Sequence, residues 1–158
     1  MRCSTIALTG ALCLTVVACG GDSGSARTTG PNTLAKGSMS ASIDGRAWAA
    51  AVSVAAVRNA NNIIAVSGGD ATPVVIAFAL VDSGPRTYTI SNRSATNAFV
   101  TMGGNAWSAS LSQGSGSVTI TSLTATEVKG TFAFTGVAPP GANPGTRVVS
   151  NGQFDVKF

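Results

Sequence analysis

The chain has 158 residues, a length expected for one domain, and it carries ten Lys and Arg against six Asp and Glu. Charged residues make up only 10 % of it, whereas about 25 % is usual, and the cations stand singly along the chain. A nucleic-acid-binding surface requires a dense basic stripe, so the composition indicates no nucleic-acid partner.

The N-terminal segment has the pattern of an export signal. Arg2 precedes an apolar run from Ile6 to Ala18, and small residues follow it. A cationic start, an apolar stretch of about 7–15 residues and a small-residue exit are typical of a secretory signal. The run is shorter than the ~20 residues that span a bilayer. We therefore predict that residues 1–18 are a signal peptide and not a transmembrane helix.

The exit of this segment, Val16-Val17-Ala18-Cys19, resembles the lipobox of bacterial lipoproteins. In that family the chain is cleaved just before the cysteine, the thiol is joined to diacylglycerol, and the new amine is acylated, with palmitate as a common chain. The resemblance implies lipidation of Cys19, and two or more acyl chains give stable anchoring. The alternative is a conventional signal peptide whose exit includes a cysteine.

Residues 19–37 are rich in Gly, Ser and Thr and are predicted to be a flexible linker after the lipidated cysteine. Such a chain has an r.m.s. reach of roughly 25 Å. Gly20 follows the cysteine in place of Asp, which in the resembling lipoproteins permits transport to the outer membrane. We expect a protein of the cell envelope, exported and anchored to the outer membrane on its periplasmic or surface face.

Residues 38–158 are expected to form one all-β domain. Apolar residues alternate with period two in "RTYTIS", "SVTITSL", "EVKGTFAFT" and "GQFDVKF", and no helical stripe is present. Residues 74–81, "VVIAFALV", are apolar on both faces and predict a central strand; Gly130 predicts a bulge. About ten short strands with short turns predict an antiparallel meander, as an up-and-down barrel or a β-sandwich.

One motif occurs twice, as "IDGRAWAA" at 43–50 and "MGGNAWSA" at 102–109. Asp-Gly and Gly-Gly are two-residue hairpin turns, and such turns fix the strand register. The register pairs Trp48 with Ala41 and Trp107 with Val100, so both indoles point to the apolar face of their hairpins. The second face is expected to extend to Leu111.

Two interpretations of these tryptophans remain open at the level of sequence. Each is a core residue next to a turn, or, with Tyr88, they line the mouth of a barrel that binds an apolar or sugar ligand. Arg46 is expected at the rim of the first hairpin.

The residue types of catalysis are scarce. The chain has no His, and its three Cys stand at positions 3, 13 and 19, so Ser-His-Asp catalysis and the usual zinc and copper sites are excluded for residues 38–158. No Asp-x-Asp spacing suggests calcium. We expect no metal and no cofactor.

The acidic residues indicate turns and surface, not catalysis. Asp44, Asp70 and Asp82 stand in "DG", "GGD" and "DSGP", where Asp caps its own backbone. Glu127 and Asp155 fall on outward faces beside lysines. A glycosidase needs two carboxylates flanking one bond, and the pattern gives no such pair, so the protein is not expected to be an enzyme.

The remaining candidates are surfaces for partners. The loop at 136–146 is long and contains three prolines, which favours a functional rim. Val75 and Phe99 are expected on faces opposite to the core, where an exposed apolar patch would bind a partner. The sequence favours a non-catalytic binding module for a small apolar or sugar ligand or an envelope protein; the alternative is a structural or assembly lipoprotein of the envelope with no small-molecule ligand.

Four features together resemble a family of uncharacterised bacterial lipoproteins that contain a domain of unknown function. They are the lipobox with its spacer, "ASIDGRAWAA", "SGSVTITSLTATEVKGTFAF" and "VVSNGQFDVKF". Members of that family share an I-D-G-x-x-W start, a G-T-F-x-F strand and an N-G-x-F-x-V-x-F end. The resemblance implies the fold and the cellular location and no particular activity.

The lipid anchor is tested by metabolic labelling with a fatty-acid probe. The wild-type chain should carry the label, and the Cys19→Ala variant should lose it because the acceptor thiol is gone. Label that persists on the variant would refute lipidation at this cysteine.

Overall fold

The computed structural model describes residues 37–141 and 145–158. The predicted signal peptide, Cys19 and all but the last residue of the predicted linker therefore lie outside the described residues, as do residues 142–144 of the long loop. Within the described ranges, no helix is long and apolar enough to cross a membrane.

The described residues form eleven strands and no helix, which confirms the predicted all-β class. In chain order the strands are β1 (Gly37–Ile43), β2 (Arg46–Ala49), β3 (Ser53–Arg58), β4 (Ile63–Gly69), β5 (Val75–Val81), β6 (Thr87–Ile90), β7 (Asn97–Met102), β8 (Asn105–Ala109), β9 (Ser115–Leu123), β10 (Glu127–Val137) and β11 (Thr146–Lys157).

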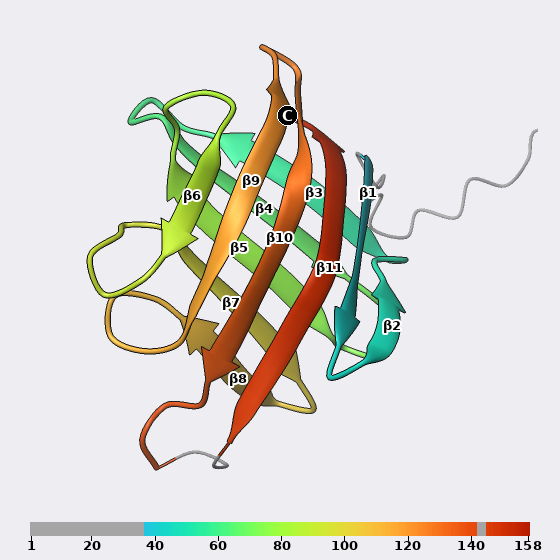
Figure 1. Cartoon of the computed structure of the whole chain (residues 1–158). Coiled ribbons are helices and arrows are strands. Elements are labelled where there is room, and N and C mark those ends of the chain that lie inside the picture. The colour runs from blue at the N-terminus through green and yellow to red at the C-terminus, as the bar shows by residue number, and fades with distance from the viewer. Residues whose placement is uncertain (1–36, 142–144) are drawn as a thin grey trace, which may run out of the picture. The chain divides into compact units, whose positions relative to one another are not determined.

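The strands curl into a half-barrel with two facing halves (Figure 1). The back half has the order β3-β4-β5-β7-β8, and the front half has β6-β9-β10-β11-β1-β2. All pairings are antiparallel, and the halves are joined where Ser108 of β8 pairs with Val137 of β10. Most neighbours are connected by short turns, as a meander predicts. Four pairs are not: β6 leaves the back half to pair with β9, so β5 pairs with β7 and β8 with β10, and β1 pairs with β11.

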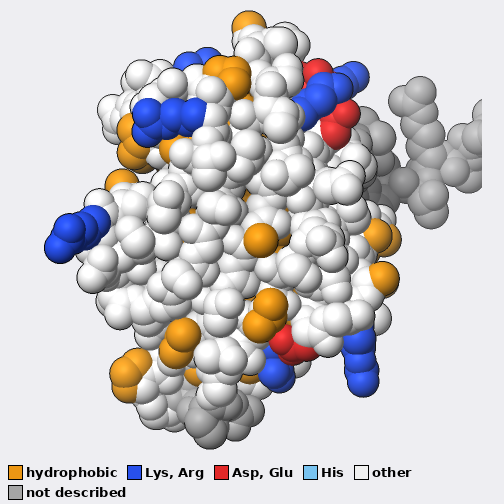
Figure 2. Space-filling view, in the orientation of Figure 1, with side chains coloured by type: hydrophobic (Ala, Val, Ile, Leu, Met, Phe, Trp, Pro, Cys, Tyr) orange, Lys and Arg blue, Asp and Glu red, His pale blue; other side chains and the backbone are white. Residues whose placement is uncertain are grey.

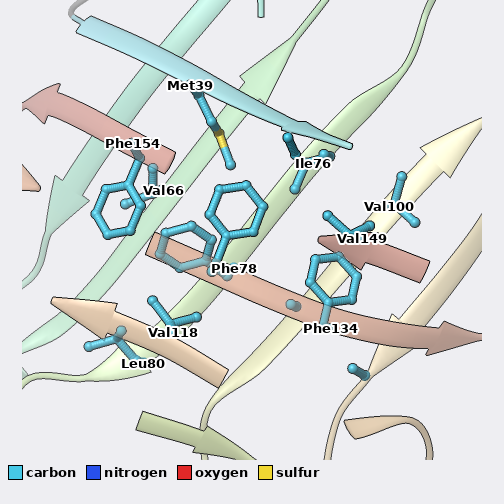
Figure 3. Packing of buried hydrophobic residues seen from close by; sticks show 14 of the residues in the cluster. Met39, Val66, Ile76, Phe78, Leu80, Val100, Val118, Phe134, Val149 and Phe154 are labelled. Atoms are coloured by element: carbon cyan, nitrogen blue, oxygen red, sulfur yellow. The ribbon is translucent and has the colours of Figure 1, made fainter. Parts of the chain in front are cut away.

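The core lies between the two halves and is filled by the inward residues of both. Phe78 of β5 packs against Phe132 of β10 and Phe154 of β11, with ring centroids 5.5 and 5.0 Å apart. Figure 3 shows Met39 and Val118 of the front half reaching toward the same rings. The predicted central strand is confirmed, because β5 lies between β4 and β7.

Both predicted hairpin registers are confirmed. Trp48 pairs with Ala41 and Trp107 pairs with Val100, and both indoles are buried. The prediction for Leu111 is wrong: this residue is 57 % exposed. Strand β8 ends at Ala109, and the following turn breaks the two-residue alternation on which the prediction rested.

Two irregularities bend the long strands β9, β10 and β11. The first lies opposite Gly130, where Lys129 pairs with Ser122 and Gly130 with Ile120. The extra residue is therefore Thr121 of β9, so the bulge is in the strand beside the predicted glycine and not at Gly130 itself. The second lies in β11, where Asn151 has φ +51° and precedes Gly152. A Cβ on Gly152 would lie 2.6 Å from the Phe132 ring. The Asn-Gly pair of the closing motif is therefore a bulge within a strand, not a hairpin turn.

The connection from β2 to β3 crosses from the front half to the back half. Ala50 donates its N–H to the Met39 carbonyl, and Ala51 donates to the Gly69 carbonyl at 3.1 Å. Gly68 leaves room for the Met39 side chain, since a Cβ there would lie 2.8 Å from the sulfur. These contacts hold the β1–β2 hairpin against the end of β4 and so position the site described below.

Gly130 provides a test of this packing. In Gly130→Ala the new methyl group would clash with the Thr119 carbonyl oxygen and would lie 2.8 Å from the Phe154 ring. We expect a loss of about 1–3 kcal/mol in the free energy of unfolding, measured in urea. Thr131→Ala, at the exposed neighbour on the same strand, should change it by less than about 0.5 kcal/mol. Equal effects of the two changes would contradict the packing.

Candidate ligand-binding cleft

A cleft of about 500 Å³ opens at one end of the half-barrel. Turns of both halves form it: β1–β2, β4–β5 and β7–β8, together with the start of β11. Its lining combines charged, hydroxyl and apolar side chains with one indole: Ile43, Asp44, Arg46, Ala47, Trp48, Asp70, Thr72, Val74, Met102 and Arg147.

Asp44 fixes the β1–β2 turn to strand β11. Its backbone N–H donates to the Val148 carbonyl at 2.8 Å, and its carboxylate Oδ1 accepts the Val148 N–H at 2.9 Å. Its other carboxylate oxygen lies 3.4 Å from the Arg147 Nε. Asp44 adopts φ +49°, which the hairpin turn requires. One residue therefore makes the turn, closes the seam to β11 and orients a cation of the cleft.

Arg147 covers the second tryptophan. Its guanidinium carbon lies 4.5 Å from the centre of the Trp107 ring, a distance typical of a cation–π contact. Trp107 is only 4 % exposed and lies beneath Arg147, outside the set of cleft-lining residues. Trp48 of the β1–β2 hairpin therefore lies in the wall of the cleft, and Trp107 of the β7–β8 hairpin lies in the layer beneath it.

Trp48 and Asp70 meet in the wall of the cleft. Asp70 Oδ1 accepts the backbone N–H groups of Thr72 at 2.8 Å and Val74 at 3.0 Å. Partial burial raises the pKa of Asp70, but these bonds, the Thr72 hydroxyl and the Trp48 indole outweigh it, so the pKa lies below its usual value of 3.8. Asp70 is therefore a carboxylate near neutral pH.

Three buried donors at this end of the domain form no hydrogen bond of good geometry. Among the described residues they are Trp48 Nε1, Trp107 Nε1 and Arg147 Nε. Arg147 Nε still forms an ion pair with Asp44 at 3.4 Å, and the Trp48 indole lies against the Asp70 carboxylate and helps to lower its pKa. A fully unpaired buried donor costs about 1–3 kcal/mol, so the two cleft carboxylates reduce this cost at Arg147 and Trp48.

Arg46 stands at the mouth of the cleft, at the rim where the hairpin register predicted it. Its side chain is exposed, and none of the ion pairs in the described ranges involves it. The cleft therefore holds two carboxylates, two guanidinium groups and the Thr72 hydroxyl. It offers donors and acceptors together over an apolar floor of Ile43, Val74 and Met102.

Tyr88 lies elsewhere. Its hydroxyl donates to the Gly84 carbonyl at 2.6 Å and accepts the Ser83 N–H at 2.8 Å, so it holds the β5–β6 turn. It lines a different depression, with Arg86 and Arg93. Of the three aromatic residues suggested by the sequence, the structure brings Trp48 and Trp107 to one end of the domain and leaves Tyr88 apart.

The predicted roles of the acidic residues hold with one exception. Asp70 and Asp82 cap their own turns, since Asp82 accepts the Gly84 N–H at 2.7 Å. Asp44 is the exception, because its carboxylate bonds to a strand 104 residues away. The other two acids, Glu127 and Asp155, flank Lys129, as their outward placement predicted. No group of three or more His, Cys, Asp or Glu able to hold a metal occurs in residues 37–141 and 145–158.

Asp44 and Asp70 line the same cleft, so the acids are not all dispersed. A carboxylate pair that hydrolyses a glycosidic bond needs one member with a raised pKa that acts as an acid. Asp70 has a lowered pKa, and Asp44 is occupied by the Val148 N–H and by Arg147. The two carboxylates therefore do not have the arrangement of a glycosidase pair.

Sequence reasoning missed Arg147, Asp70 and Met102 as members of a site. The three come from separate turns, and each has a local explanation in its own segment. For Arg147 and Asp70 the available signal is that the chain has few charged residues, so charged residues next to turns at the same end of a sheet are candidates for a shared cleft. Met102 has no such signal.

The chain belongs to a domain family described as a domain of unknown function, DUF6252, which matches residues 35–155. The match covers the whole β domain apart from its last three residues. Neither a curated protein nor a solved structure matches the chain. Membership in this family supports the predicted recognition of an uncharacterised domain; the lipoprotein features remain a prediction.

Asp70 provides a pH-dependent test of the cleft. Asp70→Asn should lower the free energy of unfolding at pH 7 by about 1 kcal/mol, because weaker hydrogen bonds replace those to the carboxylate. The folded pKa is lowered, so the wild-type contribution is complete above 3.8 and disappears as the pH falls through the folded value.

Urea unfolding at several pH values measures this difference. The gap between wild type and variant should be constant from neutral pH down to about 4 and shrink below it. A gap that does not change under acid conditions would show that the charge of Asp70 stabilises nothing.

Proposed function

We propose that the protein is a lipid-anchored, non-catalytic binding module of the cell envelope that takes a sugar in the cleft at the end of the half-barrel. The observation that carries this proposal is the cleft itself, which gathers two carboxylates, two guanidinium groups, the Thr72 hydroxyl and the Trp48 indole at one end of the domain. The lipobox resemblance at Cys19 and the flexible linker support the anchoring.

The composition of the cleft favours a sugar over an apolar ligand. A sugar presents hydroxyl groups that donate and accept hydrogen bonds around a weakly apolar ring. Asp44 and Asp70 supply acceptors, Arg46 and Arg147 supply donors, and the Trp48 ring and Met102 supply apolar contact. A wholly apolar molecule would leave these polar groups without water and without partners, which is unfavourable.

The interior also argues against an apolar ligand inside the barrel. Phe78, Phe132 and Phe154 pack within 6.3 Å of one another between the two halves. Figure 3 shows side chains from both halves meeting in this region. Binding at the surface cleft requires no opening of this core.

The alternative is a structural or assembly lipoprotein of the envelope with no small-molecule ligand. A separate feature favours it, namely the uncharged outward face of the back half, where Phe99 is 39 % exposed. The two functions use different surfaces, so one protein can combine them.

Intrinsic fluorescence tests the cleft directly, because the chain has two tryptophans and both lie at this end. We expect a set of neutral and acidic mono- and oligosaccharides to contain at least one that shifts the emission of the full chain saturably. Trp48→Phe removes the indole that acts on Asp70 and reduces the aromatic surface in the wall of the cleft, so it should weaken that binding about tenfold. The affinity of the variant is measured by calorimetry.

Tyr88→Phe is the matched control, since it also replaces a polar aromatic residue by Phe, in a different depression. It should leave the affinity unchanged. The proposal fails if no sugar alters the emission, or if Trp48→Phe binds as tightly as the wild type.

A further inference from the structure

The outward face of the back half carries no charged side chain on any of its five strands. Its residues are small or aliphatic apart from one phenylalanine: Ser53, Ala55, Val57, Ile63, Ala65, Ser67, Gly69, Val75, Ala77, Ala79, Val81, Asn97, Phe99, Thr101, Ala106 and Ser108. We call this set the back face. It is the face on which Val75 and Phe99 were expected.

The back face has a few exposed large hydrophobic residues among many small residues. Val57, Val81 and Phe99 are 61 %, 46 % and 39 % exposed, and they are half of the large hydrophobic residues that are exposed in the described ranges. Phe99 shares one row with Ala77 and Ser67, its cross-strand neighbours on β5 and β4. The face therefore has a bulky side chain on β7 and a shallow trough along β4.

The front half has a different outward surface. Hydroxyl and amide side chains form its rows, such as Thr119, Thr131 and Gln153, and Lys129 bridges Glu127 and Asp155 at one end. In Figure 2, which views this half, most of the surface is white, the colour of the backbone and of uncharged polar side chains, and the charged groups lie near the margin. The front half also exposes Val148 at 47 %, but this residue stands beside Arg147 and opposite Thr135. The exposed hydrophobic residues of the back face have no charged residue among their outward neighbours.

The dimensions of the back face suit a weak protein interface. Five strands about 4.8 Å apart and outward rows about 7 Å apart give a footprint of roughly 500 Å². A standard stable interface buries about 800 Å² on each partner, and weaker ones bury less. A face of this size favours a dimer that dissociates on dilution.

We propose that the back face binds the back face of a second copy of this chain, with a two-fold axis between the sheets and parallel to β5. An uncharged face has no charges to match with a differently charged partner, whereas two copies bury no unpaired charge. A two-fold interface uses the same patch on both subunits, and two twisted sheets pack face to face in this manner in β-sandwiches.

The position of the axis also fits the sizes of the side chains on the face. It lies over β5, where the small side chains of Ala77 and Ala79 allow the two backbones to approach closely. Because β4 and β7 flank β5, the axis places β7 of each copy over β4 of the other. Phe99 of one copy then lies over Ser67 in the trough of its partner, and the reciprocal contact is identical.

Sedimentation analysis of the full chain, wild type and variants alike, tests the dimer. The wild type should show a concentration-dependent monomer–dimer equilibrium with a Kd of about 1–100 μM. Phe99→Lys should weaken it at least about tenfold, because it buries two charges near a symmetric contact. Thr131→Lys adds the same charge on the front half and should leave the Kd unchanged.

A cross-linking experiment locates the interface independently of stability. Ala79→Cys, close to the proposed axis, should give a covalent dimer with a short bismaleimide, above the background of the wild-type chain. Ala133→Cys, an equally small residue on the outward face of β10, should not. A chain that stays monomeric at about 100 μM, or equal cross-linking of the two cysteine variants, would overturn the proposal.

Discussion

The contact between Phe78 and the rings of Phe132 and Phe154 is the interaction on which the rest of the domain depends. Phe78 belongs to the back half and its two partners to the front half, so these rings hold the halves together. The chain has no cysteine after position 19, so no disulfide can stabilise the β domain. Burial of apolar surface must therefore offset the chain entropy.

The cleft is a consequence of this packing. The β1–β2 turn comes from the front half and the β4–β5 turn from the back half, so the cleft exists only while the halves face each other. Asp44 strengthens the arrangement from the front, through Val148 and Arg147. Few charges occur in the described residues, and four of them line this one cleft. Charged residues that served only solubility would be dispersed over the surface. Their concentration at the cleft therefore indicates a role in binding.

The sequence predicts those features that depend on near neighbours. Alternation fixes which residues of a strand face inward, and a two-residue turn fixes the pairing of its hairpin, so Trp48 and Trp107 were placed correctly. The alternation does not show which half of the sheet a strand joins. The pairing of β6 with β9 therefore has no local signal in the sequence. The bond between Asp44 and Val148 joins residues 104 positions apart, beyond any pattern of spacing. Leu111 was misplaced because alternation was extended past the end of its strand.

The two interpretations of the tryptophans are compatible once their nitrogens are considered separately from their rings. Burial of the rings satisfies the structural interpretation, because Trp48 and Trp107 belong to the core. Their N–H groups form no hydrogen bond of good geometry, although the indole N–H of a buried tryptophan usually has a partner. The Trp48 indole acts on the Asp70 carboxylate, and the Trp107 ring lies 4.5 Å from the Arg147 guanidinium. Each indole therefore contacts a charged group of the cleft, so the two core residues also position the polar groups that a ligand would contact.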